Sequence, residues 1–296
     1  MMSRVSVFVV VLACLSAGVP VSRGSTRDCR PQGALTRVPD LPEASGLALS
    51  RRTPGQLWAH NDSGEPIVIA LDGKGRVAGR VRISGASVED WEALAVGPCS
   101  GGSCLYIADI GDNDGRRPRV TIYRVPEPAP TDSAAEVDAA FHVTYPDGSH
   151  DAEALLMTPA GDMFIVTKGD TGPIAVYRVP RNIRAGGTAP LERVGQPFTP
   201  AKAVRDFRIT DGAVSPDGEW VALRTKADLV FYRASELLKG TWREAQRVSL
   251  APLGEPQGEG IALGAAAAVY LAGEGGGKGR PGTFIQFACA AVQPAQ

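Results

Sequence analysis

The stretch Thr210-Asp-Gly-Ala-Val-Ser-Pro-Asp-Gly-Glu-Trp-Val-Ala-Leu223 decides the fold, because its pattern recurs along the chain. It joins a short polar start, an apolar strand, a Pro-Asp-Gly turn and a second apolar strand. The first part of this pattern recurs about every 50 residues. Its copies are Ala44–Ala48, Trp91–Ala95, Ala152–Leu156, Thr210–Val214 and Gly258–Ala262. Repetition at this period predicts one supersecondary unit used several times.

Each copy is followed by short runs rich in Val, Ile, Tyr and Phe, which strands favour. Second strands are expected at residues 57–60, 105–108, 163–166, 220–223 and 269–272, and third strands at 67–70, 120–123, 174–177, 229–232 and 283–286. The first four copies also show an outer strand, at 77–83, 140–144, 191–194 and 245–250. Four strands in a unit of about 40 to 50 residues are typical of a β-propeller blade.

We therefore predict an all-β protein that forms a single β-propeller of five four-stranded blades. The fifth repeat shows no fourth strand before the chain ends at Gln296, and Ala34–Val38 can supply it and close the ring. The two longest intervals between repeats are expected to hold long loops. A six-bladed ring, with one degenerate blade formed across the termini, is the alternative.

The composition agrees with many short strands. The chain has 35 Gly and 23 Pro among 296 residues, and these turn-forming residues lie between the apolar runs. With 21% charged and 44% hydrophobic residues, the chain has the composition of a globular protein rather than a disordered one. Its 31 Lys and Arg balance 32 Asp and Glu, which argues against nucleic acid as a partner.

The N-terminus has the pattern of a secretory signal, with a basic start and an apolar run from Val5 to Val19. We predict a signal peptide at residues 1–24, cleaved after Gly24, and a propeller domain at residues 25–296. The product is expected to be an extracellular or periplasmic monomer with no transmembrane span after processing. Two alternatives stay open: a lipoprotein acylated on Cys14, and a retained N-terminal anchor.

Five cysteines are present, and processing at the N-terminus removes or acylates one of them. The remaining four are expected to form two disulfides in an oxidising compartment. Cys99 and Cys104 lie in one short Gly-rich loop and should pair with each other. That leaves Cys29 to pair with Cys289 and to join the start of the mature chain to its end. A thiolate metal site is the competing hypothesis, but the spacing differs from paired Cys-x-x-Cys motifs.

Several further motifs resemble those of exported bacterial propeller proteins of the WD40-like and TolB-like type. They are His60–Gly64, Glu89–Ala95, Ile107–Asn113, Ile122–Glu127, His150–Glu153, Ser215–Gly218 and Glu255–Glu259. The resemblance implies the fold and export, but not an activity, because the group shares none that is agreed. Phytase-like and lactonase-like propellers bind Ca²⁺ through acidic residues at the centre of the ring, which is an analogy at the level of the fold.

Acidic residues recur where a propeller would bring them together. Loops that enter the innermost strands and loops that follow the second strands should open on one face, and Asp90 and Asp151 lie in the former. One residue per repeat is expected near the axis: Glu92, Glu153, Asp211 and Glu259, with Ser45 in the fifth place. Converging carboxylates repel one another unless a cation neutralises them, and Ca²⁺ favours such oxygen ligands. The candidate metal ligands are Glu92, Glu153, Asp211, Glu259, Asn61, Asp62, Asp109 and Asn113.

Two other interpretations of these acids stay open. Lys168, Arg224 and Lys226 can neutralise them, or the acids can bond backbone amides of adjacent blades. The candidate catalytic residues are His60, Glu92, Glu153, Lys168 and Arg224. Several enzyme signatures are absent, namely a Gly-x-Ser-x-Gly elbow, His-Glu-x-x-His and a Walker loop. No cofactor-binding residues are predicted, and Ca²⁺ is the one cofactor considered. The loop from Asp109 lacks the Glu that an EF-hand needs at its twelfth position.

We therefore expect an exported propeller whose acidic central channel binds a small ligand or a divalent cation, as a binding or scaffold module. One alternative is a metal-assisted hydrolase of phosphoesters or lactones. A second alternative is a protein-interaction propeller without catalysis. The sequence names neither a substrate nor a protein partner.

Overall fold

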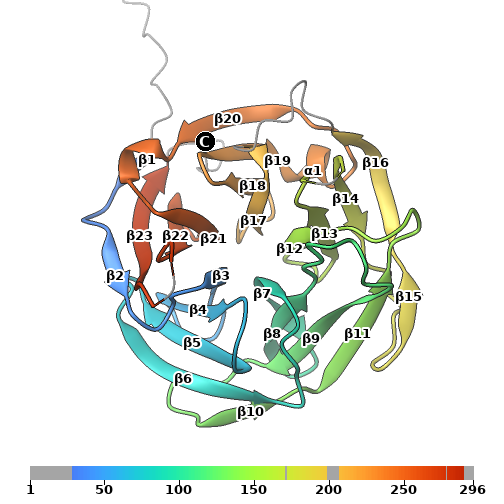
Figure 1. Ribbon diagram of the computed structural model, residues 1–296, viewed down its shortest axis with the longest axis horizontal. Coiled ribbons are helices and arrows are strands. Elements are labelled where there is room, and N and C mark those ends of the chain that lie inside the picture. The colour runs from blue at the N-terminus through green and yellow to red at the C-terminus, as the bar shows by residue number, and fades with distance from the viewer. Residues whose placement is uncertain (1–28, 171, 199–206, 278, 290–296) are drawn as a thin grey trace, which may run out of the picture.

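A computed structural model describes residues 29–170, 172–198, 207–277 and 279–289. The predicted signal peptide and Cys14 lie outside these residues. The described chain forms five antiparallel β-sheets arranged as blades around a central axis (Figure 1), which confirms the predicted five-bladed propeller. Of the described helices, α1 (Ala234–Leu237) and η2 (Ala251–Leu253), neither is long or apolar enough to cross a membrane.

The blades follow one another in chain order. Blade 1 contains β3 (Ala44–Leu49), β4 (Gln56–Asn61), β5 (Ile67–Asp72) and β6 (Val77–Ser84), and blade 2 contains β7 (Trp91–Cys99), β8 (Gly102–Asp109), β9 (Val120–Pro126) and β11 (Ala139–Thr144). Blade 3 contains β12 (Ala152–Met157), β13 (Met163–Thr167), β14 (Ile174–Arg178) and β16 (Glu192–Phe198). Blade 4 contains β17 (Ile209–Val214), β18 (Trp220–Thr225), β19 (Asp228–Arg233) and β20 (Glu244–Ser249). Blade 5 contains β21 (Gln257–Leu263), β22 (Ala268–Glu274) and β23 (Gly282–Cys289).

The N-terminal part of the chain completes blade 5, as the sequence predicted. Two short strands, β1 (Cys29–Pro31) and β2 (Thr36–Val38), both pair antiparallel with β23. Cys29 lies opposite Cys289 in this register, and the two form a disulfide. The second predicted disulfide, Cys99–Cys104, is also present. The N-terminal segment that leads into blade 1 is therefore held in blade 5 by backbone hydrogen bonds and by a covalent bond.

The two longest intervals between repeats contain strands that the sequence did not predict. The strand β10 (Ala134–Glu136) lies between β9 and β11 of blade 2, but it pairs in parallel with β6 of blade 1. The strand β15 (Thr188–Pro190) lies between β14 and β16 of blade 3 and pairs in parallel with β11 of blade 2. Each long loop thus covers the outer edge of the preceding blade, an edge that would otherwise expose unpaired backbone groups.

Apolar side chains between neighbouring blades form the core. One buried cluster contains Trp58 and Val68 of blade 1 together with Trp91 and Ile107 of blade 2. Both tryptophans are fully buried. Because each blade buries both faces against its neighbours, its strands carry apolar residues on both sides, and removal of one blade would expose two others.

The disulfide at the ring closure should contribute much more stability than the local one. Its cysteines are 260 residues apart in sequence, against 5 for Cys99–Cys104, and closing a long loop restricts the unfolded chain more. We expect Cys29→Ser with Cys289→Ser to lower the free energy of unfolding by about 2–5 kcal/mol. Urea denaturation measures this loss, and Cys99→Ser with Cys104→Ser is the matched control. Equal losses in the two double variants would contradict the prediction.

The turn between β21 and β22 is a point of backbone strain. Ala266 and Ala267 have positive φ angles of 51° and 66°, where an L-residue other than glycine costs about 1–2 kcal/mol. Ala266 is exposed, so Ala266→Gly removes this cost without opening a cavity. We expect a higher melting temperature for Ala266→Gly in calorimetry. Ala265→Gly, one position earlier and outside the left-handed region, should instead leave it unchanged or lower it.

Candidate functional site

A β-bulge near the start of every inner strand directs side chains into the channel. The register slips between Trp91 and Ala93 in blade 2 and between Ala152 and Ala154 in blade 3, which leaves Glu92 and Glu153 as the extra residues. Corresponding slips occur in the inner strands of blades 1, 4 and 5. A bulge rotates the side chain of the extra residue out of the normal alternation. The sequence repeat therefore encodes a repeated bulge.

The bulges show that Asp211 does not occupy the same position in its blade as Glu92 and Glu153, although the sequence repeat aligned them. In blade 4 the slip lies between Ile209 and Asp211, so Thr210 and not Asp211 corresponds to Glu92 and Glu153. The Asp211 carboxylate instead accepts hydrogen bonds from the backbone N–H groups of Gly212 (2.7 Å) and of Ile261 (2.8 Å) in blade 5. Asp211 thus joins two blades. This agrees with the alternative interpretation in which the acids bond backbone amides of adjacent blades.

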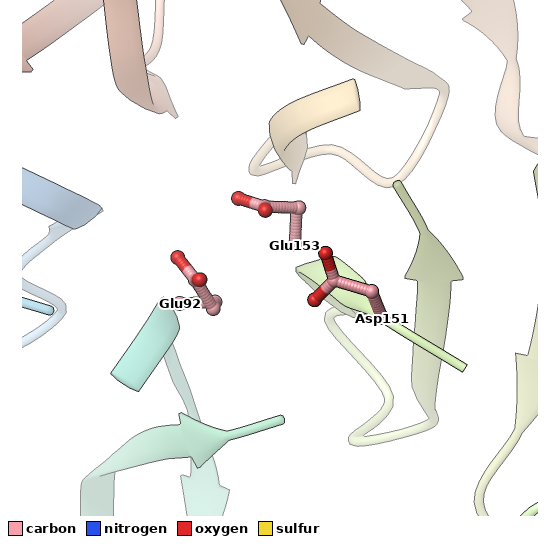
Figure 2. Close-up of side chains that lie close together, drawn as sticks. All are labelled: Glu92, Asp151 and Glu153. Carbon is pink, nitrogen blue, oxygen red and sulfur yellow. The ribbon is translucent and has the colours of Figure 1, made fainter. Parts of the chain in front are cut away.

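Three carboxylates from blades 2 and 3 meet at one mouth of the channel. Oxygen atoms of Glu92, Asp151 and Glu153 all lie within 4.8 Å of one another, and the three side chains gather beside the channel (Figure 2). Each of these residues is less than 10% exposed, at 7%, 6% and 3%. We call these three residues the acidic cluster.

Lys168, which directly follows β13, is the cation of this site. Its ammonium group lies 3.1 Å from Oδ2 of Asp151, contacts Oε1 of Glu153, and donates a hydrogen bond of 3.4 Å to Oδ1 of Asn113. Burial alone would lower the pKa of Lys168, but the charges of Glu153 and Asp151 raise it above the ordinary lysine value. Lys168 is therefore a permanent positive charge at the edge of the acidic cluster.

One ammonium group does not neutralise the acidic cluster. Burial raises the pKa of Glu92 well above the ordinary value, and repulsion from Glu153 and Asp90 adds to this effect. Burial also raises the pKa of Glu153 well above the ordinary value, although the charge of Lys168 opposes this effect, and repulsion from Glu259 and Asp151 adds to it. Both side chains consequently favour the protonated form more than free carboxylates do, unless a further cation approaches.

The negative charge continues around the channel mouth into blades 5 and 1. Burial and repulsion from Glu274 raise the pKa of Glu259 to about 7. Burial and repulsion from Asp62 raise the pKa of Glu274 to about 6. Burial and repulsion from Glu43 likewise raise the pKa of Asp62 to about 6. Three further carboxylates thus titrate in the weakly acidic range. We call the mouth that these residues and the acidic cluster surround the acidic mouth.

Other predicted ligands hold loops in place. Asp109 accepts hydrogen bonds from the N–H groups of Glu89 (3.1 Å) and Asp90 (3.2 Å) and pairs with Arg117 at 2.8 Å. The Asn61 side chain donates to the carbonyl of Asp40 and accepts from the N–H of Glu43, at 3.0 Å each. Asn113 is exposed and donates to Asp90 at 3.2 Å, which leaves it beside the acidic cluster.

Two candidate catalytic residues are inaccessible from the channel. His60 is fully buried, packs edge-on against Trp91, and shares a 3.0 Å hydrogen bond between its Nδ1 and the carbonyl of Asn61. Burial lowers the pKa of His60 to about 4, so the ring is neutral at physiological pH. Arg224 is also fully buried and pairs with Glu255 at 2.6 Å. Both side chains serve packing and inter-strand contacts.

Asp151 belongs to the acidic cluster but was not among the candidate metal ligands, because the sequence pattern assigned one acidic residue per repeat to the axis. A signal for it exists in the sequence, since Asp90-Trp-Glu92 and Asp151-Ala-Glu153 place an aspartate two residues before the glutamate at the bulge. Arg117, which pairs with Asp109, carries no comparable signal, because it lies in a loop outside the repeated pattern. Glu255 belongs to the motif Glu255–Glu259, but that motif does not indicate its pairing with Arg224.

Comparisons with known proteins show the fold. Neither a protein-family model nor a curated protein matches the chain. The PQQ-bound aldose sugar dehydrogenase from Streptomyces coelicolor is similar in structure, with a TM-score of 0.53 and 13% identity over 88% of this chain and 98% of that one. A gluconolactonase from Xanthomonas campestris gives a TM-score of 0.45 at 12% identity, over 85% of this chain and 89% of that one. At so low an identity, the similarity to the sugar dehydrogenase supports the β-propeller fold and shows nothing about activity.

The raised pKa of Glu259 predicts that this residue destabilises the folded protein at high pH. Glu259 holds its proton more tightly in the folded state than in the unfolded state. Its contribution to the free energy of unfolding is therefore fully present below pH 4.5 and is lost as the pH rises to about 7. Glu259→Gln should therefore be more stable than the parent protein at pH 8, by about 1–3 kcal/mol, and this advantage should shrink at pH 5. Urea denaturation at both pH values measures the difference. The exposed Glu136→Gln is the control, and an advantage of Glu259→Gln that does not depend on pH would refute the prediction.

Proposed function

We propose that the protein is an exported ligand-binding propeller whose acidic mouth binds a divalent cation, and that this cation is Ca²⁺. The observation that carries the proposal is the convergence of Glu92, Asp151 and Glu153 on one point. The two disulfides support export, because such bonds persist in oxidising compartments. Extracellular Ca²⁺ modules work with dissociation constants of about 10⁻⁴–10⁻³ M, which suits a site of this kind.

The donor set fits a hard cation. Ca²⁺ takes six to eight oxygen ligands at 2.3–2.6 Å, so oxygens that face each other across the ion are about 5 Å apart. The carboxylate oxygens of the acidic cluster lie within 4.8 Å of one another. Glu92, Asp151 and Glu153 would hold the ion, and Asn113 is near enough to Lys168 to supply a further oxygen.

Charge supports the same conclusion. The acidic cluster carries three carboxylates against one ammonium group, and burial, with repulsion between the carboxylates added to it, keeps the pKa values of Glu92 and Glu153 raised although Lys168 is present. A divalent ion would relieve this repulsion and keep both side chains ionised. Lys168 already occupies one side of the cluster, so the ion would either share the carboxylates with Lys168 or displace its ammonium group.

Hydrolysis of lactones or phosphoesters would use the same residues. A bound Ca²⁺ would polarise a substrate oxygen, and the carboxylates would hold the ion. His60 and Arg224 would have no direct role, because both are fully buried. Binding without turnover remains our principal proposal, since it requires only the convergent carboxylates of the acidic cluster.

Calcium should raise the melting temperature, because a ligand of the folded state stabilises that state by mass action. At ten times the dissociation constant the gain is about 1.4 kcal/mol, or a few degrees for a chain of this size. Differential scanning fluorimetry in 5 mM Ca²⁺, 5 mM Mg²⁺ or EDTA measures it. Glu92→Gln and Glu153→Gln should abolish the Ca²⁺-dependent gain, whereas Glu136→Gln should keep it.

The same set of variants separates the proposals. Absence of any Ca²⁺-dependent gain at millimolar concentrations would overturn the metal site. Turnover of a lactone or a phosphoester that requires Ca²⁺ and disappears in Glu92→Gln would favour the hydrolase.

A further inference from the structure

The opposite mouth of the channel holds a cavity whose wall differs in chemical character from the acidic mouth. Its volume is about 370 Å³, and it is bounded by the ends of all five inner strands. Most of the side chains in its wall are apolar, and the larger ones include Leu49, Leu94, Val96, Leu155, Met157, Val214 and Leu263. No acidic side chain of the described residues lines it. Small-molecule sites typically occupy about 300–1,000 Å³ with mostly apolar walls, and this cavity falls within that range.

The hydroxyl groups of Ser50 and Ser215 in the wall already donate to other residues, and the hydroxyl oxygen of Thr158 accepts a hydrogen bond from the backbone N–H of Asp162 at 3.0 Å. Ser50 donates its hydroxyl hydrogen to the buried carboxylate of Glu127, and Ser215 donates to Asp217. Each of these two oxygens also accepts a backbone N–H, from Thr53 and from Trp220. The side chains of the wall therefore offer few hydrogen-bonding groups to a solute. A ligand with an apolar body would gain most from this cavity, because it releases water from apolar surface.

A single positive charge lies at the rim. Arg51 lines the cavity, is exposed, and has no ion-pair partner within the described part of the chain. The carboxylate of Glu127, which accepts a hydrogen bond from the neighbouring Ser50, also accepts hydrogen bonds from Trp58 and Ser103. An apolar cavity with one unpaired guanidinium group at its edge is complementary to a molecule with an apolar body and one carboxylate.

We propose that this apolar mouth binds a small apolar carboxylate, such as a medium-chain fatty acid. The hydrocarbon part lies among Leu94, Leu155 and Leu263, and the carboxylate accepts hydrogen bonds from Arg51. The site is independent of the acidic mouth, because it is built from the ends of the inner strands rather than from their starts. The central channel thus carries two sites of opposite preference, one for cations and one for an apolar anion.

Isothermal titration calorimetry with decanoate tests the proposal. Decanoate should bind, and decyltrimethylammonium, which has the same chain with the opposite charge, should bind at least tenfold more weakly. Arg51→Gln should weaken decanoate binding about fivefold, the effect of one exposed ion pair. Arg52→Gln is the matched control, since Arg52 is the neighbouring exposed arginine but does not line the cavity.

A second variant tests the position of the hydrocarbon chain. Ala213 is half-buried in the wall, and Ala213→Leu should fill part of the cavity and reduce decanoate binding at least tenfold. Equal binding of the two amphiphiles, equal effects of Arg51→Gln and Arg52→Gln, or unchanged binding in a folded Ala213→Leu protein would each overturn the proposal. Should Ala213→Leu fail to fold, the two arginine variants and the two amphiphiles decide the question by themselves.

Discussion

The pairing of the first described strands with the last one is the constraint on which the rest of the structure depends. β1 and β2 both bond to β23, and the Cys29–Cys289 disulfide fixes their register. Without this pairing, blade 5 would end in an open edge and the ring could separate there. Each inner strand contacts the inner strands of the two neighbouring blades, so the central channel exists only while the ring is closed.

Bulges in the inner strands convert the closed ring into a charged channel. The bulge holds a glutamate in blades 2, 3 and 5 and a hydroxyl residue in blades 1 and 4, and in blades 1 and 5 a glycine follows it within the bulge. Ser45 and Thr210 donate hydrogen bonds to the backbone carbonyls of Glu92 and Glu259 in the next blade. The hydroxyl residues therefore connect blades, and the glutamates supply charge. Because blades 2 and 3 are adjacent, Glu92 and Glu153 meet on one side of the channel and concentrate the negative charge there.

The two mouths of the channel differ because every inner strand changes character along its length. Each strand begins with polar residues at its bulge and ends in apolar residues such as Leu49, Val96 and Val214. The ring repeats this gradient in each blade, so one mouth collects carboxylates and the other collects hydrocarbon side chains. Burial then strengthens the repulsion at the acidic mouth, since buried carboxylates repel one another more strongly than exposed ones.

The sequence by itself determined the number of blades, the closing strand, both disulfides and two members of the acidic cluster. These features follow from local patterns, namely turn residues, strand periodicity and the spacing of repeats. Only the tertiary structure decided that Thr210 rather than Asp211 occupies the bulge, that Asp151 and Lys168 complete the charged group, and that β10 and β15 join preceding blades. It alone also revealed the apolar cavity. Each of these depends on strand register or on contacts between blades, and a shift of one residue in register reverses the direction of a side chain without changing the sequence pattern.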